Sequence, residues 1–358
     1  MLVSFPHMDK MHLALEKVCQ TLQVPYLTPP LPGPETLKRG QELAPEGSCL
    51  PFCLVLGNMR QALDMGADAI MMLGGSGPCR FGYFVYLAVK ILKAAGYEFT
   101  EMIIDKGYHR QNYKILRQMA PVSLPALIQA AHLGWELLCG EEILDRIGRE
   151  YAPLATDRPG FNEFMASARS SLRKAASPQE AILLKRSVIT HLHSLEMYPA
   201  DSVIRVGLIG DIYTLLEPFA NHQVEDFFAA RNVAVYKEMS VSGWLPNILL
   251  PWKKGVYRRN LLENAQPYLT SSVGGFGLET VANARVMGQK HIDGLVQLFP
   301  MGCMPEIVAR SALDKMCRDQ KTPALFVTLD QHHSPTGFET RLEAFLDVLY
   351  TKKQQHAV

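Results

Sequence analysis

Apolar and polar residues along the first third of the chain follow a regular order of helix, strand, loop, helix and strand. The apolar residues of 51–65 (PFCLVLGNMRQALDM) have the spacing of an amphipathic helix. The run ADAIMML at 67–73 predicts a buried parallel strand. A glycine-rich loop at 74–82 leads into a predicted helix at 83–95, and 98–104 predicts the next strand. This order is typical of a doubly wound α/β domain.

The middle of the chain, 113–200, has helical spacing and no run that reads as a buried strand. The spacing is clearest at 124–138 and 180–195. A turn-rich stretch at 151–161 (YAPLATDRPGF) is expected to interrupt the helices. We therefore predict a mostly helical connecting region.

The second half returns to the alternating order. Strands are predicted at 202–209, 234–236, 294–298 and 323–329, and helical spacing at 210–230, 305–317 and 340–350. We predict two doubly wound domains of the Rossmann or flavodoxin-like kind at 1–112 and 201–358, joined by the helical region 113–200. Ligands of such sheets bind beyond the carboxyl ends of the strands, so the cleft between the domains is the expected site.

Length, charge and apolar content argue against several classes of function, namely nucleic-acid binding, lipid binding and membrane-spanning proteins. A length of 358 residues suits two domains. With 36 basic and 35 acidic residues, the chain has no electrostatic footprint for nucleic acid or anionic lipid. Its longest apolar runs fall short of the roughly 20 residues that a membrane span needs. Charged residues near the N-terminus interrupt what would be a signal peptide, so we expect a cytoplasmic protein that binds neither membrane nor nucleic acid.

Seven cysteines in a large chain without secretion signals favour metal or redox use over disulfides. Three of them, Cys49, Cys79 and Cys303, each stand just before a predicted helix. Helix N-termini present unpaired N–H groups and the positive end of the helix dipole, which stabilise anionic sulfur. We therefore predict a shared metal site that these three cysteines form, of the iron-sulfur type. Three thiolates would leave one iron of a cubane open to substrate.

Other interpretations of the cysteines stay open. Each can be a small buried apolar side chain, which is what we expect of Cys19, Cys139 and Cys317 because they lie within helical patterns. Zinc is a weaker alternative, since structural zinc sites are usually built from close cysteine pairs such as CxxC. Cys53, four residues after Cys49, could be a fourth ligand.

Weaker candidates lie elsewhere in the second half. His332 and His333 follow the predicted strand at 323–329 and could transfer protons. The segment VGGFGLET, which begins at Val273, could cradle phosphate or form a structural turn. Glu306 stands at a helix start, where pairing with the helix dipole explains it as well as catalysis does.

Several motifs in a fixed order together resemble a known family. They are SCLPFCLVLGN, GADAIMMLGGSGPCRFGYF, VGLIGDIYTLLEPFANHQVEDFF, DGLVQLFPMGCMPEIVA and ETRLEAFLDVL. They resemble the activator-dependent 2-hydroxyacyl-CoA dehydratase superfamily, and within it most nearly the acyl-CoA dehydratase activase-related proteins. That superfamily includes benzoyl-CoA reductase subunits and double-cubane cluster proteins. The matched segments run from about residue 28 to residue 350, and the helical middle matches poorly.

The resemblance implies a 4Fe-4S cluster between two α/β domains, with three ligands that map onto Cys49, Cys79 and Cys303. It also implies a separate ATP-hydrolysing activator that delivers single low-potential electrons under anaerobic conditions, and a second cluster subunit or a homodimer. The relatives reduce a CoA thioester by one electron so that a hydroxyl group can leave, or reduce small molecules. The chain has no GxxxxGK[ST] motif, so the ATPase would be another protein.

Two features depart from the family pattern. Cys53 stands where the resemblance leads us to expect another residue type, which leaves open a fourth ligand or a modified cluster. Only four cysteines lie in the matched segments, so we favour a single 4Fe-4S cluster over a double cubane. The expected function is a reductase or dehydratase component, and the alternative is a non-catalytic electron-transfer or cluster-carrier protein. A metal-free α/β protein that binds a small ligand is the third interpretation.

Overall fold

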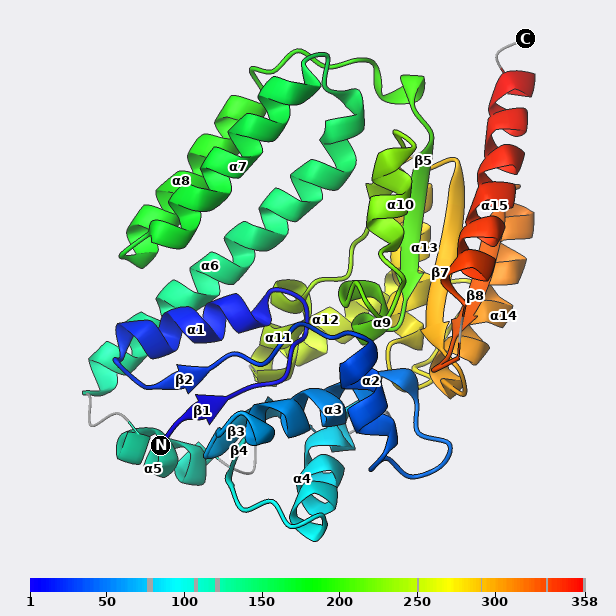
Figure 1. The fold of residues 1–358 in the computed structure, drawn as a ribbon. Helices are drawn as coiled ribbons and strands as arrows, with labels where there is room; N and C mark the ends of the chain where they lie inside the picture. The colour runs from blue at the N-terminus through cyan, green and yellow to red at the C-terminus, as the bar shows by residue number, and fades with distance from the viewer. Residues whose placement is uncertain are drawn as a thin grey trace. The chain divides into compact units, whose positions relative to one another are not determined.

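The computed structural model describes residues 1–75, 80–105, 109–119, 123–249, 251–290, 292–332 and 334–356. These residues form a mixed α/β structure with two four-stranded parallel sheets, which confirms the predicted α/β class (Figure 1). Contacts within the chain divide it into two compact units. One comprises Met1–Glu142 and Ser170–Ser187, and the other comprises Ile143–Arg169 and Val188–Val358.

The first unit contains a sheet with strand order β2-β1-β3-β4. Its strands and flanking helices are β1 (Val3–Ser4), α1 (Met11–Thr21), β2 (Tyr26–Leu27), α2 (Pro34–Gln41), α3 (Leu50–Asp64), β3 (Ala69–Leu73), η1 (Arg80–Tyr83), α4 (Phe84–Ala94) and β4 (Thr100–Ile104). Strand β1 pairs with both β2 and β3, and β3 pairs with β4. The chain therefore adds β2 on one side of β1, and then β3 and β4 on the other side. The gap between the carboxyl ends of β1 and β3 is the switch point at which such sheets bind ligands.

Helix α3 begins at the predicted position because Pro51 lies in its first turn, where a missing N–H costs nothing. The helix is buried over most of its length. Helix α2 packs directly on α3, and glycines make this close approach feasible. A Cβ atom at Gly57 would overlap the carbonyl oxygen of Thr36, and one at Gly40 would overlap that of Cys53.

Between β4 of the first sheet and the first strand of the second sheet, the chain is mostly helical. The helices are α5 (His109–Met119), α6 (Leu124–Tyr151), η3 (Ala152–Leu154), α7 (Arg158–Lys174) and α8 (Pro178–Leu192). The predicted interruption at 151–161 is confirmed, since α6 ends at Tyr151 and α7 starts at Arg158. Each of the long helices α6, α7 and α8 contributes residues to both units. The domain boundaries at 112 and 200 stay a prediction. Within the described ranges, no helix combines the length and the apolar character needed to cross a membrane.

The second unit contains a sheet with strand order β6-β5-β7-β8, the same winding as in the first. Its elements are η4 (Ala200–Ser202), β5 (Arg205–Gly210), α9 (Ile212–Leu216), α10 (Val224–Ala230), β6 (Ala234–Tyr236), α11 (Val241–Leu249), α12 (Pro251–Ala265), α13 (Gly277–Gly288), β7 (Gly294–Pro300), α14 (Met304–Asp319), β8 (Ala324–Leu329) and α15 (Pro335–His356). Here the switch point lies between the carboxyl ends of β5 and β7.

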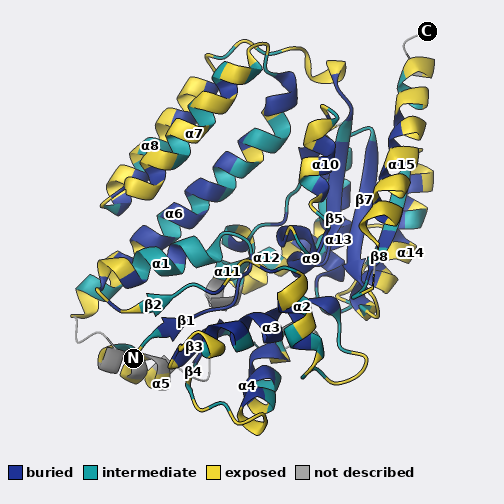
Figure 2. Cartoon of the chain, in the orientation of Figure 1, coloured by how far each residue is buried: buried dark blue, intermediate teal, exposed yellow. Residues whose placement is uncertain are grey.

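Strand β7 forms the centre of the second unit's core. All of its residues are buried, as the dark blue arrow in Figure 2 shows. Glycines again permit close packing: a Cβ atom at Gly294 would lie 2.7 Å from Phe345 of α15, and one at Gly207 would lie 2.8 Å from Met287 of α13. The apolar side chains of α13 and α14 complete this core.

The structure differs from the predicted pattern in several elements, and helices α1, α2, α11 and α12 were not predicted. Strands β1 and β2 were not predicted, because two residues are too few to produce an alternation. The helical spacing at 210–230 corresponds to two helices, α9 and α10, with Pro218 between them and left-handed backbone at His222 and Gln223. Helix α15 extends well beyond the predicted 340–350 at both ends.

Candidate metal centre

Cys49 is the N-cap residue of α3, with an extended backbone (φ −75°, ψ 155°). Its carbonyl oxygen accepts hydrogen bonds from the N–H groups of Phe52 (3.0 Å) and Cys53 (3.2 Å). The half-buried side chain makes no capping hydrogen bond to the helix. Since α3 leads into β3, its first turn lies toward the carboxyl edge of the first sheet. The sulfur therefore lies at the positive end of a 15-residue helix.

Cys303 has the same local arrangement in the second unit. It is the N-cap of α14 and follows the carboxyl end of β7, and its carbonyl oxygen accepts from the N–H of Ile307 at 3.0 Å. The turn between strand and helix uses Gly302 with φ +74°, a conformation that glycine adopts without strain. Its side chain is half-buried, and the neighbouring Met301 and Met304 are 58% and 68% exposed. A partner or ligand can therefore reach this part of the second unit.

Cys79 lies outside the described residues, as does the neighbouring Gly77. The ends of its loop are described: β3 ends at Leu73 and α4 begins at Phe84. In chain order Cys79 follows the third strand of its sheet, as Cys303 follows the third strand of the second sheet. Both loops therefore start at a switch point.

Cys53 lies in the first turns of α3 and is 1% exposed. Burial, and then the neighbouring Cys49, raise the pKa of its thiol to about 12. A thiol must lose its proton to bind iron, so this environment disfavours the fourth-ligand role, which stays a prediction.

The remaining cysteines are part of the helices, as expected. Cys19 belongs to the core of the first unit and Cys317 to that of the second. Burial raises the pKa of each thiol to about 11. Cys139 is half-buried on α6. Both core cysteines are buried apolar side chains, and neither has the exposure that a reactive thiol requires.

The described residues contain no group of three or more His, Cys, Asp or Glu side chains arranged to hold a metal ion. Cys79 is not among those residues, and Cys49 and Cys303 belong to different units. The predicted set of three ligands therefore stays a prediction.

A buried polar network lies behind Cys303 at the carboxyl edge of the second sheet. Glu306 on α14 is 0% exposed, and its carboxyl accepts a hydrogen bond from Gln297 Nε2 at 2.9 Å. Thr280 Oγ1 lies 2.9 Å from Glu306 Oε1 and 3.2 Å from the carbonyl oxygen of Gly210. Burial raises the pKa of Glu306 to about 8. The sequence shows only a glutamate near a helix start, which does not distinguish this network from an exposed side chain.

Two more acids lie near Glu306. Asp211 caps α9 by accepting from the N–H and Oγ1 of Thr214, both at 3.1 Å, and burial raises its pKa. Burial also raises the pKa of Glu279 on α13 to about 7, although a hydrogen bond from Tyr257 acts against that shift.

His7 follows β1 in the first unit and was missed because β1 is so short. Its ring is 2% exposed, and Nε2 lies 2.7 Å from the carbonyl oxygen of Pro29. Because a carbonyl only accepts, Nε2 carries the proton and Nδ1 does not. Nδ1 is buried and has no hydrogen-bond partner among the described residues. Burial lowers the pKa of His7 to about 4, so the ring is a neutral base at the first switch point.

The weaker candidates are the glycines of the segment VGGFGLET and the two histidines after β8. A Cβ atom at Gly277 would lie 2.5 Å from the carbonyl oxygen of Pro305, and Gly274 and Gly275 have φ of +85° and +48°. Close packing and turn geometry therefore account for these glycines. His332 is exposed, and its backbone N–H donates to Asp330 Oδ1 at 2.8 Å. His333 lies outside the described residues.

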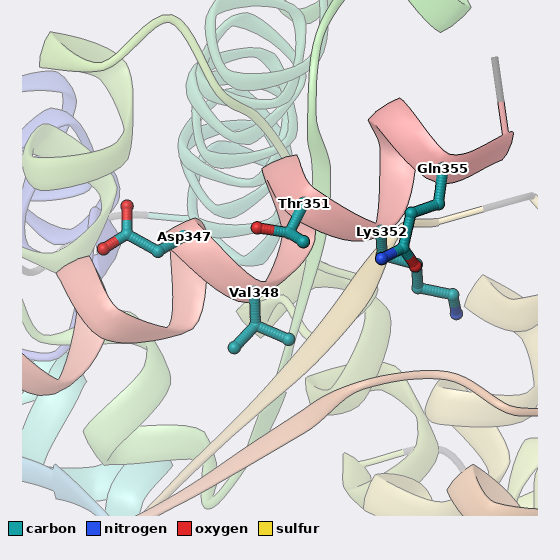
Figure 3. A pocket seen from close by; sticks show the side chains of 5 residues that line it. All are labelled: Asp347, Val348, Thr351, Lys352 and Gln355. Carbon is teal, nitrogen blue, oxygen red and sulfur yellow. The ribbon is translucent and has the colours of Figure 1, made fainter. Parts of the chain in front are cut away.

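A shallow hollow on α15, drawn in Figure 3, contains none of the candidate ligands. The residues that line it are Asp347, Val348, Thr351, Lys352 and Gln355. They belong to one face of one helix, and Lys352 Nζ donates to the carbonyl oxygen of Lys321. The hollow is a surface feature of the second unit with no part in the proposed centre.

No protein-family model matches the chain, and no curated protein matches it. The resemblance to the 2-hydroxyacyl-CoA dehydratase superfamily therefore rests on the motifs quoted above.

Proposed function

We propose that the chain is an iron-sulfur protein in which the thiolates of Cys49, Cys79 and Cys303 hold one 4Fe-4S cluster. One observation carries this proposal: Cys49 and Cys303, far apart in the sequence, are both half-buried N-cap residues of long helices. Each helix begins toward the carboxyl edge of a sheet, and both sheets have the same winding. The proposal requires the two units to bring these cysteines to a common cleft.

The donor set suits such a cluster. Thiolate sulfur is the ligand that iron-sulfur clusters use, and a cluster with thiolate ligands is net negative. The positive ends of the helix dipoles at the starts of α3 and α14 would stabilise that charge and tune the reduction potential. When bound, the cluster supplies one-electron reduction. Three protein ligands would leave one iron for a substrate or an external ligand, whereas Cys53 as a fourth ligand would give a closed relay site.

The reaction class follows from the family resemblance. We propose a cytoplasmic reductase or dehydratase component that receives low-potential electrons from an ATP-hydrolysing activator. The exposed apolar side chains beside Cys303, Met301 and Met304, support an encounter with another protein or subunit at this place.

Anaerobic purification and reconstitution with iron and sulfide test the proposal. The expected result is a brown protein with close to four irons per chain, as a 4Fe-4S cluster requires. Cys49→Ser, Cys79→Ser and Cys303→Ser are each expected to lose most of the iron. Cys139→Ser, the change of a half-buried cysteine on α6, is the matched control and keeps it. A wild-type protein that stays colourless and iron-free would overturn the proposal.

Electron paramagnetic resonance then separates an enzyme from a relay. A cluster with an open iron changes its spectrum when a substrate thioester or a small anionic ligand is added. An unchanged spectrum would favour the non-catalytic electron-transfer alternative.

A further inference from the structure

The hydrogen bonds around Thr280 can be satisfied in only one protonation state. Its hydroxyl has a single hydrogen but lies within hydrogen-bond distance of three oxygens: the Gly210 carbonyl at 3.2 Å, Glu306 Oε1 at 2.9 Å and Glu306 Oε2 at 3.1 Å. The carbonyl can only accept. If Thr280 donates to Gly210, then Glu306 must donate to Thr280, and for that its carboxyl must carry a proton. An ionised Glu306 would take the hydrogen of Thr280 and leave the Gly210 contact without one.

The other oxygen of Glu306 fits the same state. Gln297 Nε2 donates to Oε2 at 2.9 Å and to the backbone carbonyl of Glu306 at 3.1 Å. Gln297 is 1% exposed, and its own Oε1 has no hydrogen-bond partner in the part of the chain that the structure describes. Each group in the network therefore donates a hydrogen bond to the next: Gln297 to Glu306, Glu306 to Thr280, and Thr280 to the carbonyl oxygen of Gly210.

The charges that face Glu306 also favour the neutral acid. Asp211, at the start of α9, and Glu279, on α13, are acidic and act on it from two other elements, and β7 contributes only the neutral Gln297. Within the part of the chain that the structure describes, no lysine or arginine pairs with Glu306. A buried carboxylate without a cationic partner is unfavourable, so the proton stays on Glu306.

We propose that Glu306 is a protonated clamp, which ties the first turn of α14 to β5 and α13 while it is neutral and releases this turn when it loses its proton. Cys303 is the N-cap of the same turn, so the clamp sets the position of this cysteine. The clamp makes the stability of the second unit fall as the pH rises through the neutral range. It needs no metal, and it stands whether or not the chain holds a cluster.

Glu306→Gln is the decisive variant, because an amide has the shape of a protonated carboxyl and can donate to Thr280 through Nε2. Urea unfolding of the full chain is measured from pH 5 to pH 9 for the wild type, Glu306→Gln and the control Glu339→Gln, which changes an exposed glutamate on α15. In the wild type, Glu306 makes the folding equilibrium constant fall by up to tenfold per pH unit from about pH 5 to its folded pKa of about 8, above which the fall levels off. Glu306→Gln is expected to lose that factor, and Glu339→Gln to keep it.

An unchanged pH dependence in Glu306→Gln would overturn the proposal. If this variant does not fold, infrared spectroscopy of the double variant Asp211→Asn/Glu279→Gln replaces it, because that background removes the two other acids near Glu306 whose pKa burial raises. A band of protonated carboxyl groups that persists at pH 7 and is lost at higher pH supports the clamp. Absence of the band at pH 7 overturns it. Neither measurement depends on iron, so a failure here is distinct from a failure of the proposed function.

Discussion

Gly277 lies against Pro305, so close that a Cβ atom at residue 277 would stand 2.5 Å from the Pro305 carbonyl oxygen. The contact joins the first turn of α13 to the first turn of α14. It therefore helps to define where Cys303 lies, together with the network around Glu306.

Gly277→Ala is expected to lower the free energy of unfolding by about 1–3 kcal/mol, because one of the two backbones must move. Urea unfolding measures the loss. Gly255→Ala is the matched control: residue 255 lies on the exposed part of α12, and none of the described residues places an atom within 4 Å of an added Cβ. It is expected to be neutral or to stabilise by up to about 1 kcal/mol, since alanine favours helix over glycine. Equal effects of the two substitutions would contradict this role of Gly277.

Cys53→Ala separates a packing cysteine from a ligand. The side chain is 1% exposed, so its truncation is expected to cost about 1–2 kcal/mol of unfolding free energy. The iron content after anaerobic reconstitution is expected to stay that of the wild type, whereas Cys303→Ala loses iron. Loss of iron from Cys53→Ala as well would instead identify a four-thiolate site.

His7 is expected to make the first unit sensitive to acid. Burial lowers its pKa from 6.5 to about 4, so the unfolded chain binds more protons than the folded chain between these values. Its contribution to stability is complete above about pH 6.5 and is lost as the pH falls toward 4, on the order of 3 kcal/mol in total. Urea unfolding of His7→Gln at pH 4.5, 5.5 and 7 is expected to show a flatter pH dependence. His193→Gln, at an exposed position, is the control and keeps the wild-type profile.

Lys237 and Glu225 form an ion pair at 2.5 Å in the second unit, and the lysine side chain is only 7% exposed. Lys237 and Arg149 together outweigh the effect of burial and lower the pKa of Glu225. This pair therefore stabilises the fold above the unfolded pKa of a glutamate and loses that effect as the pH falls through the folded value.

Lys237→Met is expected to cost about 1–3 kcal/mol at pH 7, as for the loss of a hydrogen bond to a charged group, and less at pH 4. Thermal or urea unfolding at the two pH values measures the difference. The more exposed pair of Lys290 and Glu238 provides a comparison, and Lys290→Met is expected to cost under about 1 kcal/mol. A cost of Lys237→Met that does not change with pH would contradict the role of the pair.

Much of the fold was predictable because long buried strands and amphipathic helices leave clear periods in the sequence. The strand at Gly294–Pro300 and the helix at Met304–Asp319 match their predicted positions closely. The two-residue strands β1 and β2 have no such period, so the switch-point histidine His7 was missed with them. The structure places Cys49 and Cys303 at helix starts as predicted, because proline and the preceding turn mark those starts in the sequence. The network of Glu306 depends on contacts between α13, α14 and β7, which no local pattern reveals.

The two sheets have equivalent strand orders, and this equivalence extends to the charge at their carboxyl edges. The chain directly after the first strand of each sheet carries a buried titratable side chain, His7 in one unit and Asp211 in the other. Burial drives both toward their uncharged forms, the base by giving up a proton and the acid by keeping one. Both side chains are therefore less charged at the two sheet edges than exposed side chains of the same types would be.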